Sequence, residues 1–169
     1  LISQPINIFK IMKFDIIVIG SGPGGYVAAI RASQLGKKVA IVEKAELGGI
    51  CLNWGCIPTK ALLKSAQVFE YLKHSADYGI NVKEASIDFE AIVKRSRGVA
   101  GNMSKGIEFL MKKNKITVIK GAALLVGNKK LEISSEGKKE IYEADHIILA
   151  TGARSRDLPG VAKDGVKVL

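Results

Sequence analysis

Apolar residues near the start of the chain follow two patterns. Residues 14–19 (FDIIVI) and 38–42 (KVAIV) are short and almost continuously apolar. Between them, residues 24–35 repeat apolar positions at helical spacing, and Gly36 follows. Continuous apolar runs are typical of parallel strands buried on both faces, and glycine commonly ends a helix. The pattern predicts a β-α-β unit of about thirty residues, which is long enough for a crossover connection.

The middle of the chain has the spacing of helices. Residues 59–78 follow a glycine-rich stretch and place apolar residues on one helical face, as do residues 88–113. Gly98, Gly101 and Gly106 weaken the second segment, because glycine has a low helix propensity. We therefore expect one helix over 59–78, and either one long helix or a broken pair over 88–113.

The last part of the chain is strand-like. Its short segments alternate apolar and polar residues and predict a small antiparallel meander; they are residues 116–119, 122–126, 130–134 and 139–144. Residues 146–150 (HIILA) are continuously apolar and predict a strand buried within the main sheet. The fold class predicted is α/β, with a parallel sheet and an antiparallel meander.

Composition narrows the classes of partner. The 169 residues are 47% apolar, as in a globular protein, and no apolar run approaches the roughly 18 residues of a membrane span. The net charge of +10, from 26 Lys+Arg and 16 Asp+Glu, is compatible with nucleic-acid binding. The lysines, however, are scattered singly or in pairs without interleaved aromatic residues. We expect neither nucleic acid nor a membrane as a partner.

A glycine-rich turn follows the first predicted strand. Residues 20–25 (GSGPGG) match the pattern G-x-G-x-x-G between a strand and a helix, which is the context of dinucleotide-binding turns. Gly20 would permit the tight turn, Gly22 the close approach of a pyrophosphate, and Gly25 the packing of helix on strand. The start of the following helix would supply N–H donors to the anion.

Glu43 ends the second predicted strand, eighteen residues after Gly25. A carboxylate at this position accepts hydrogen bonds from ribose hydroxyls and repels a 2′-phosphate. The pair of features predicts FAD or NAD as the ligand rather than NADP.

The only two cysteines, Cys51 and Cys56, lie five residues apart. Zinc sites normally use four ligands with cysteine pairs spaced C-x₂₋₄-C, and His74 and His146 are both distant from the cysteines in the sequence, so we expect no metal site. Thiols at this spacing near a helix start can close a small ring if the turn is distorted, and a helix start also lowers a thiol pKa. From these residues alone, a redox disulfide and a pair of buried reduced thiols remain open alternatives.

The surroundings of the cysteines carry a family resemblance. Residues 48–63 (GGICLNWGCIPTKALL) resemble the signature of the FAD-dependent pyridine nucleotide-disulfide oxidoreductases. Their residue sequence resembles that of the dihydrolipoamide dehydrogenases in particular. Glutathione and mercuric reductases share this frame but differ around Leu52, Trp54, Thr59 and Ala61. The resemblance runs from about Lys13 to the end of the chain, through GSGPGG, VEK and ATGARS.

The resemblance implies roles for individual residues. Cys51 would be the thiol that exchanges with a dithiol substrate, and Cys56 would lie against the flavin ring as the charge-transfer thiolate. Lys60, one helical turn later, would lie near the flavin N5. The implied FAD contacts are Gly20, Gly22, Pro23, Gly24, Gly25, Glu43, Lys44, Gly49, Cys51, Lys60, Ala123, Thr151 and Gly152.

The resemblance also implies a reaction and its partners. Dihydrolipoamide, carried on lipoyl domains of 2-oxoacid dehydrogenase or glycine cleavage complexes, would reduce the Cys51–Cys56 disulfide. Electrons would then pass through FAD to NAD⁺, within a homodimer. The alternatives are another flavin disulfide reductase, of the glutathione or mercuric reductase type, and a stand-alone, non-catalytic FAD- or ADP-binding module.

We expect the chain to be part of a longer protein. Residues 12–157 would be the first segment of a Rossmann-like FAD-binding domain that is incomplete here, and residues 158–169 would begin the connection to an NAD-binding domain. Residues 1–11 would be an extension or an upstream-translated segment. The chain alone would be inactive. A disulfide that must cycle fits a reducing interior, and the sequence shows no export signal. We expect the bacterial cytoplasm rather than the mitochondrial matrix.

Overall fold

The computed structural model describes residues 11–154, 156–161 and 163–166. Residues 1–10, and with them nearly all of the expected extension, lie outside this part. The elements in chain order are β1 (Met12–Ile19), α1 (Pro23–Gln34), β2 (Val39–Glu43), α2 (Gly49–Asn53), α3 (Cys56–Lys73), the 3-10 helix η1 (Ser75–Tyr78), α4 (Phe89–Lys113), β3 (Thr117–Lys120), β4 (Ala122–Gly127), β5 (Lys130–Ser135) and β6 (Lys138–Leu149).

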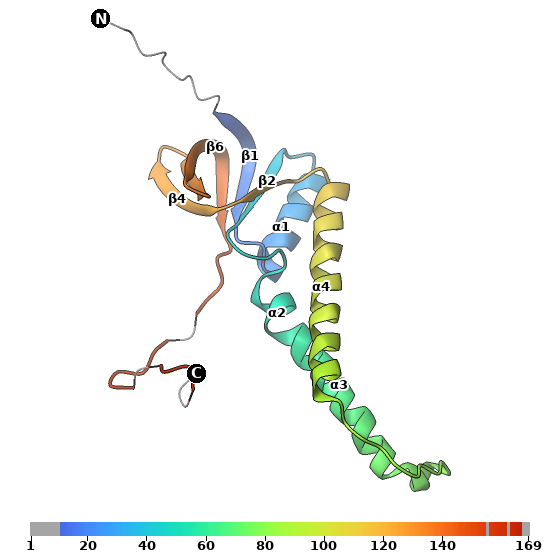
Figure 1. Ribbon diagram of the computed structural model, residues 1–169. Helices are drawn as coiled ribbons and strands as arrows, with labels where there is room; N and C mark the ends of the chain where they lie inside the picture. Colours follow the sequence, from blue (N-terminus) through green and yellow to red (C-terminus); the bar gives the residue numbers. More distant parts are fainter. Residues whose placement is uncertain (1–10, 155, 162, 167–169) are drawn as a thin grey trace, which may run out of the picture.

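The strands form one six-stranded sheet in the order β3-β2-β1-β6-β5-β4 (Figure 1). Neighbours among β3, β2, β1 and β6 run parallel, whereas β5 pairs antiparallel with both β6 and β4. The predicted α/β fold with a parallel sheet and an antiparallel meander is confirmed. The chain passes from β1 outwards to β2 and β3 and returns on the other side of β1, so the strand order reverses there. Ligands of open α/β sheets bind at such a reversal.

Both faces of the central strands are covered, which is why their sequences are continuously apolar. One core cluster lies between the parallel strands and the meander and contains Phe14, Ile17, Ala40, Val42, Ile119, Leu131, Ile133, Tyr142 and Ala144. The other lies between the sheet and the helices and contains Val18, Ala29, Ala32, Val39, Ile41, Leu52, Ile107, Met111 and Ile116. Helices α1 and α4 therefore share one face of the sheet (Figure 1).

Three of the strand predictions were wrong in detail. Residues 116–119 were expected in the meander, but β3 pairs parallel with β2. Residues 139–144 and 146–150 were expected as two strands, but β6 is continuous: its first half pairs with β5 and its second half with β1. The polar residue between the halves, Asp145, binds Lys13 of β1 at 3.1 Å. The end of β6 is also less buried than expected, since Leu149 is 63% exposed.

The helices differ from the prediction mainly at their ends. Helix α3 begins at Cys56 and ends at Lys73, before η1. Pro58 is its third residue, where a missing N–H costs no intrahelical hydrogen bond. Helix α4 is continuous, and its N-cap Asp88 accepts a hydrogen bond from the Ala91 N–H at 2.9 Å. Helix α2 was not predicted, because five residues within a glycine-rich stretch show no helical period.

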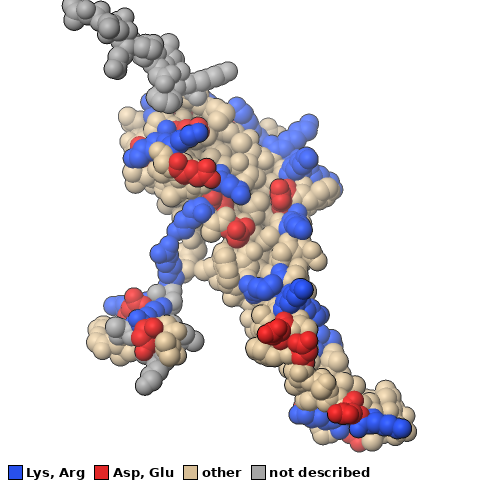
Figure 2. All heavy atoms as spheres, viewed as in Figure 1, with Lys and Arg blue, Asp and Glu red and all other residues tan. Residues whose placement is uncertain are grey.

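Helices α3 and α4 form a long hairpin that projects from the sheet (Figure 1). On the face shown in Figure 2, lysine and arginine side chains are spread over the sheet and the hairpin, with acidic side chains between them. Among the described residues, no helix combines the length and apolarity needed to cross a membrane.

Candidate functional site

The carboxyl ends of the parallel strands meet at one edge of the sheet. The Gly20 N–H donates to the carbonyl of Val42 at 2.8 Å, directly after β1. The Gly121 N–H donates to the carbonyl of Glu43 at 2.9 Å, and the Ala150 N–H to that of Ile19 at 2.8 Å. The segments that follow β1, β2, β3 and β6 are thereby tied to one another at the edge where the predicted ligand residues lie.

The three fingerprint glycines have different surroundings. A Cβ added to Gly20 would lie 2.3 Å from the carbonyl oxygen of Ala150, and φ is +99° there. A Cβ on Gly25 would lie 1.9 Å from the carbonyl oxygen of Gly20. A Cβ on Gly22 would meet nothing within 4 Å. Gly20 and Gly25 are therefore required by packing, whereas the space beside Gly22 is open to a ligand.

Helix α1 starts at this turn without a side-chain cap. Gly22 is its N-cap, Pro23 its first residue, and no side chain accepts from the N–H groups of the first turn, which include those of Gly24 and Gly25. Unpaired N–H groups and the helix dipole together favour an anion at this position. The donor set fits a pyrophosphate.

Glu43 is held in its ionised form by the dinucleotide turn, the segment over residues 20–25. Its Oε2 accepts from the Ser21 N–H at 2.9 Å and the Ser21 hydroxyl at 2.6 Å, and its Oε1 accepts from the Ala45 N–H at 2.9 Å. Burial alone would raise the pKa of Glu43, but the hydrogen bonds from Ser21, Ala45 and Lys44 outweigh it and lower the pKa. The fully buried Ser21 was missed by the sequence reasoning, because it occupies a variable position of G-x-G-x-x-G.

The other predicted FAD contacts lie around the same edge. Lys44 is exposed directly after Glu43. Thr151 and Gly152 are exposed after β6, and the Cα of Thr151 would lie 3.1 Å from a Cβ on Gly20. Ala123 is half-buried in β4, two residues after the Gly121 N–H that binds the Glu43 carbonyl. The structure places Thr151 directly against the turn. Ala123 lies two residues beyond Gly121, within β4.

The two cysteines face each other across a short break between helices. Cys51 is half-buried in α2, Cys56 is the exposed first residue of α3, and both are free thiols. A hydrogen bond to the Cys56 side chain, together with desolvation, raises the pKa of Cys51, while the Cys56 N–H and the charge of Lys60 act in the opposite direction. The Cys56 side chain and the Lys60 ammonium are therefore both near enough to Cys51 to change its ionisation.

Two glycines allow this arrangement. A Cβ on Gly55 would lie 3.0 Å from the carbonyl oxygen of Ile50 and 3.3 Å from the Cα of Cys51, so glycine lets α3 start close against α2. A Cβ on Gly49, where φ is +63°, would lie 2.7 Å from the Cα of Gly22. The start of α2 thus abuts the middle glycine of the dinucleotide turn. The cysteine turn, over residues 51–56, and the dinucleotide turn thus form one continuous site.

Two residues of α4 bind Asn53, which lies within the cysteine turn. The sequence reasoning also missed these two residues. The Ser104 hydroxyl lies 2.8 Å from Asn53 Oδ1, and Arg97 Nη1 donates to the Asn53 carbonyl at 2.8 Å. Ser104 and Arg97 lie outside any motif, so no sequence signal marks them. A cleft of about 910 Å³ opens here between α4 and the loop that joins β2 to α2, and it extends from Glu43 to Trp54.

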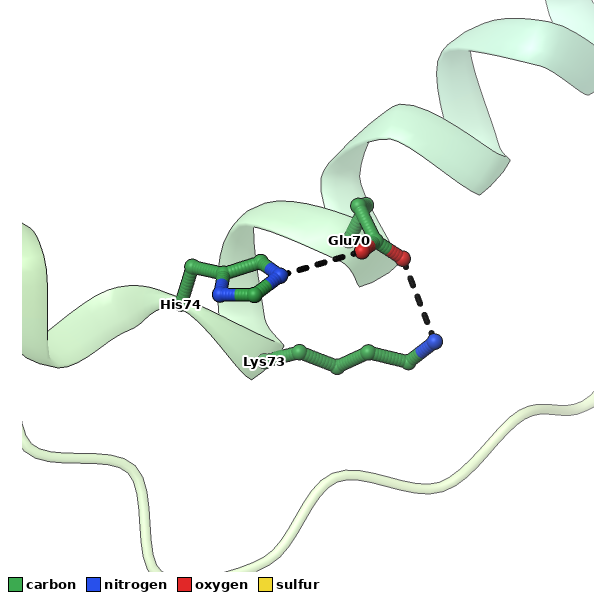
Figure 3. Close-up of polar contacts among 3 residues, drawn as sticks. All are labelled: Glu70, Lys73 and His74. Atoms are coloured by element: carbon green, nitrogen blue, oxygen red, sulfur yellow. Dashed lines mark hydrogen bonds and ion pairs between the residues drawn. The ribbon is translucent and has the colours of Figure 1, made fainter.

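His74 lies away from this site, at the far end of α3 (Figure 3). Its Nε2 lies 3.2 Å from one carboxylate oxygen of Glu70, whose other oxygen accepts from Lys73 Nζ at 3.1 Å (Figure 3). All three side chains are mostly exposed, so this cluster is a surface ion pair at a helix end. Within the described residues, no group of three or more His, Cys, Asp or Glu side chains is arranged to hold a metal ion.

Comparisons with known proteins agree with this geometry. The profile of the pyridine nucleotide-disulphide oxidoreductase family matches residues 14–169. The dihydrolipoyl dehydrogenase of Chlorobaculum parvum is 52% identical over 158 residues, which cover 93% of this chain and 34% of that protein. The dihydrolipoyl dehydrogenase of Zymomonas mobilis is 52% identical over 153 residues, and that of Bacillus subtilis 46% over 148, covering 90% and 88% of this chain and 33% and 32% of those proteins. The chain spans about a third of the length of these relatives.

Proposed function

Because the chain belongs to the pyridine nucleotide-disulphide oxidoreductase family, we propose that it forms the FAD-binding, disulfide-bearing part of a dihydrolipoamide dehydrogenase. The observation that carries this proposal is the contact between Gly49 and Gly22, which joins the cysteine turn to the dinucleotide turn. The names of the relatives support lipoamide as the substrate rather than glutathione or mercuric ion.

The residues at the sheet edge fit FAD. The open space beside Gly22 and the uncapped start of α1 suit its pyrophosphate, and the ionised Glu43 suits a ribose diol. The flavin would supply a two-electron acceptor next to the thiols. Lys44, Lys60, Ala123, Thr151 and Gly152 are the remaining contacts that we propose.

The chemistry of the chain itself is a thiol–disulfide exchange. A thiolate of the dithiol substrate attacks Sγ of Cys51 in the oxidised pair, forming a mixed disulfide and releasing Cys56 as a thiolate. The second substrate thiolate then displaces Cys51 and closes the substrate disulfide. Two electrons and two protons leave the substrate and reduce the protein disulfide to two thiols. The Lys60 ammonium favours the thiolate forms that each step needs.

Properties of the whole protein are proposed by the same reasoning. NAD⁺ would be the final acceptor, bound by a domain that residues 158–169 begin to connect to the FAD-binding segment over 12–157. The substrate would be dihydrolipoamide on lipoyl domains of 2-oxoacid dehydrogenase or glycine cleavage complexes. The working protein would be a homodimer in the bacterial cytoplasm.

A chimeric enzyme tests the proposal. The chain replaces the matching third of the Zymomonas mobilis relative, and NAD⁺ reduction is assayed with dihydrolipoamide. We expect FAD to copurify with the chimera, and activity that disappears in Cys51→Ser. A chimera that retains FAD but turns over only glutathione disulfide would show that the substrate assignment is wrong.

A further inference from the structure

Helix α2, which carries Cys51, has little stability of its own. It is five residues long, its N-cap Gly48 has a left-handed backbone (φ +96°), and no side chain caps its first turn. Isolated helices of this length do not form in water, because nucleation costs more than so few hydrogen bonds return. The position of Cys51 must therefore be set by contacts outside α2.

One such contact is apolar. Leu52 is 5% exposed and belongs to the same core cluster as Ile107 and Met111 of α4. This packing attaches α2 to α4 at Leu52, and Cys51 packs against the edge of the same cluster.

Polar contacts add to this apolar attachment. The Asn53 amide donates to the carbonyls of Leu47 and Gly49, both at 3.0 Å, and so ties the end of α2 to its beginning. The Ser104 hydroxyl lies 2.8 Å from Asn53 Oδ1 and 2.9 Å from the Leu47 carbonyl oxygen, and Arg97 binds the Asn53 carbonyl. Both amide hydrogens of Asn53 are thereby used, and its amide oxygen is one of the two acceptors within reach of the single Ser104 hydroxyl hydrogen. We call Asn53, Ser104 and Arg97 the α4 clamp.

We propose that the α4 clamp positions the redox pair: Ser104 and Arg97 act through Asn53 to hold Cys51 within reach of Cys56. The inference rests on the proposed function, since it assigns positioning residues to the same disulfide. In the reduced chain Gly55 already lets α3 start close against α2, which keeps the two thiols near each other. Without the clamp, α2 samples more orientations, and closing the disulfide then costs more conformational entropy.

The test is the thiol–disulfide equilibrium of the full chain in buffers of oxidised and reduced dithiothreitol. In Ser104→Ala, we expect disulfide formation to be about three- to tenfold less favourable than in the original chain, the range for one lost hydrogen bond. A tenfold change in this two-electron equilibrium corresponds to about 30 mV in reduction potential. Ser104→Thr keeps a hydroxyl and should restore the equilibrium.

The matched control is Ser96→Ala. Ser96 is a buried serine of the same helix, but its hydroxyl binds the carbonyl of Val93 within α4 at 2.7 Å. This variant should leave the disulfide equilibrium unchanged. Arg97→Ala removes the other arm of the clamp from an exposed position and should shift the equilibrium in the same direction as Ser104→Ala.

The outcomes separate the two proposals. If Ser104→Ala and Arg97→Ala lower the urea unfolding midpoint but leave the disulfide equilibrium unchanged, the clamp is merely structural and this inference is overturned. If the original chain forms no Cys51–Cys56 disulfide in any of these buffers, the proposed function fails as well.

Discussion

At the scale of single residues, the site is set by short polar contacts between segments far apart in the chain. Ser21 binds Glu43 across 22 residues, and Ser104 binds Asn53 across 51. Contacts of this kind leave no periodic signal, which is why the sequence predicted Glu43 and the cysteines but neither serine. The glycines could be predicted because their spacing is itself the requirement of the turn, whereas the role of the cysteines was indicated only by the family resemblance of the residues around them.

Glu43 should make the stability of the chain depend on pH. Its folded pKa lies below the unfolded value of about 4.3, so its contribution is complete above that pH and is lost as pH falls through the folded pKa. Ser21→Ala removes the side-chain hydrogen bond and raises the pKa of Glu43. We expect it to cost about 2 kcal/mol of unfolding free energy at pH 7, and less below pH 4, as measured by urea denaturation. The control is Ser65→Ala, because the Ser65 hydroxyl binds the Ala61 carbonyl within α3 at 3.3 Å. Its loss should be small and equal at both pH values. A Ser21→Ala deficit that is the same at both pH values would contradict this account of Glu43.

Lys60 should control the reactivity of Cys51. In a Cys56→Ala background, Cys51 loses the hydrogen bond that raises its pKa, and Lys60 remains as a cation that lowers it. Adding Lys60→Ala should slow the alkylation of Cys51 by iodoacetamide at pH 8 by about twofold, because the thiolate fraction falls. The difference should shrink at high salt, since exposed charges are screened.

The control for Lys60 is Lys64→Ala, one turn further along α3. The Lys64 ammonium binds Gln67 Oε1 at 3.0 Å, within its own helix. Equal slowing by both substitutions would mean that net charge, and not the position of Lys60, sets the reactivity.

At the scale of elements, the apolar pattern predicted which segments are regular but not where they pair. The run over 146–150 correctly marked a strand of the main sheet, and the alternation over 139–144 correctly marked the meander. Only pairing with β5 on one side and β1 on the other shows that both belong to β6. Likewise, the three glycines of α4 lower its helix propensity, but the contacts of its buried face with the sheet and α2 keep it continuous.

Substitutions in the turn between β1 and α1 should affect folding at one glycine and FAD binding at another. Gly25→Ala places a Cβ 1.9 Å from the Gly20 carbonyl oxygen, so we expect it to cost several kcal/mol, on the order of 3 or more, or to prevent folding. Gly22→Ala places its Cβ in open space, so the urea midpoint should stay near that of the original chain. In the chimeric enzyme, Gly22→Ala should nevertheless weaken FAD retention. Full FAD retention by a folded Gly22→Ala chimera would argue against the pyrophosphate position.

At the scale of the whole molecule, the glycine-rich turn after β1 and the start of α2 lie side by side at one sheet edge. A helical hairpin projects from the sheet (Figure 1). The hairpin begins with Cys56, so the two cysteines lie where α2 meets the hairpin. Large apolar side chains remain exposed on the hairpin and at the end of β6, for example Leu63 and Leu149. The apolar pattern predicts that these residues belong to a covered surface, but it does not predict which element covers them. For this reason the burial of residues 146–150 was overestimated.

The central claim is that Cys51 and Cys56 form a reversible disulfide that a dithiol substrate reduces. Both cysteines fall in one tryptic peptide, residues 45–60, so mass spectrometry of the digested chain tests the claim directly. After mild oxidation, that peptide should lose the mass of two hydrogen atoms, and stoichiometric dihydrolipoamide should restore them. Cysteines that stay free, or that join only different chains, would contradict the claim.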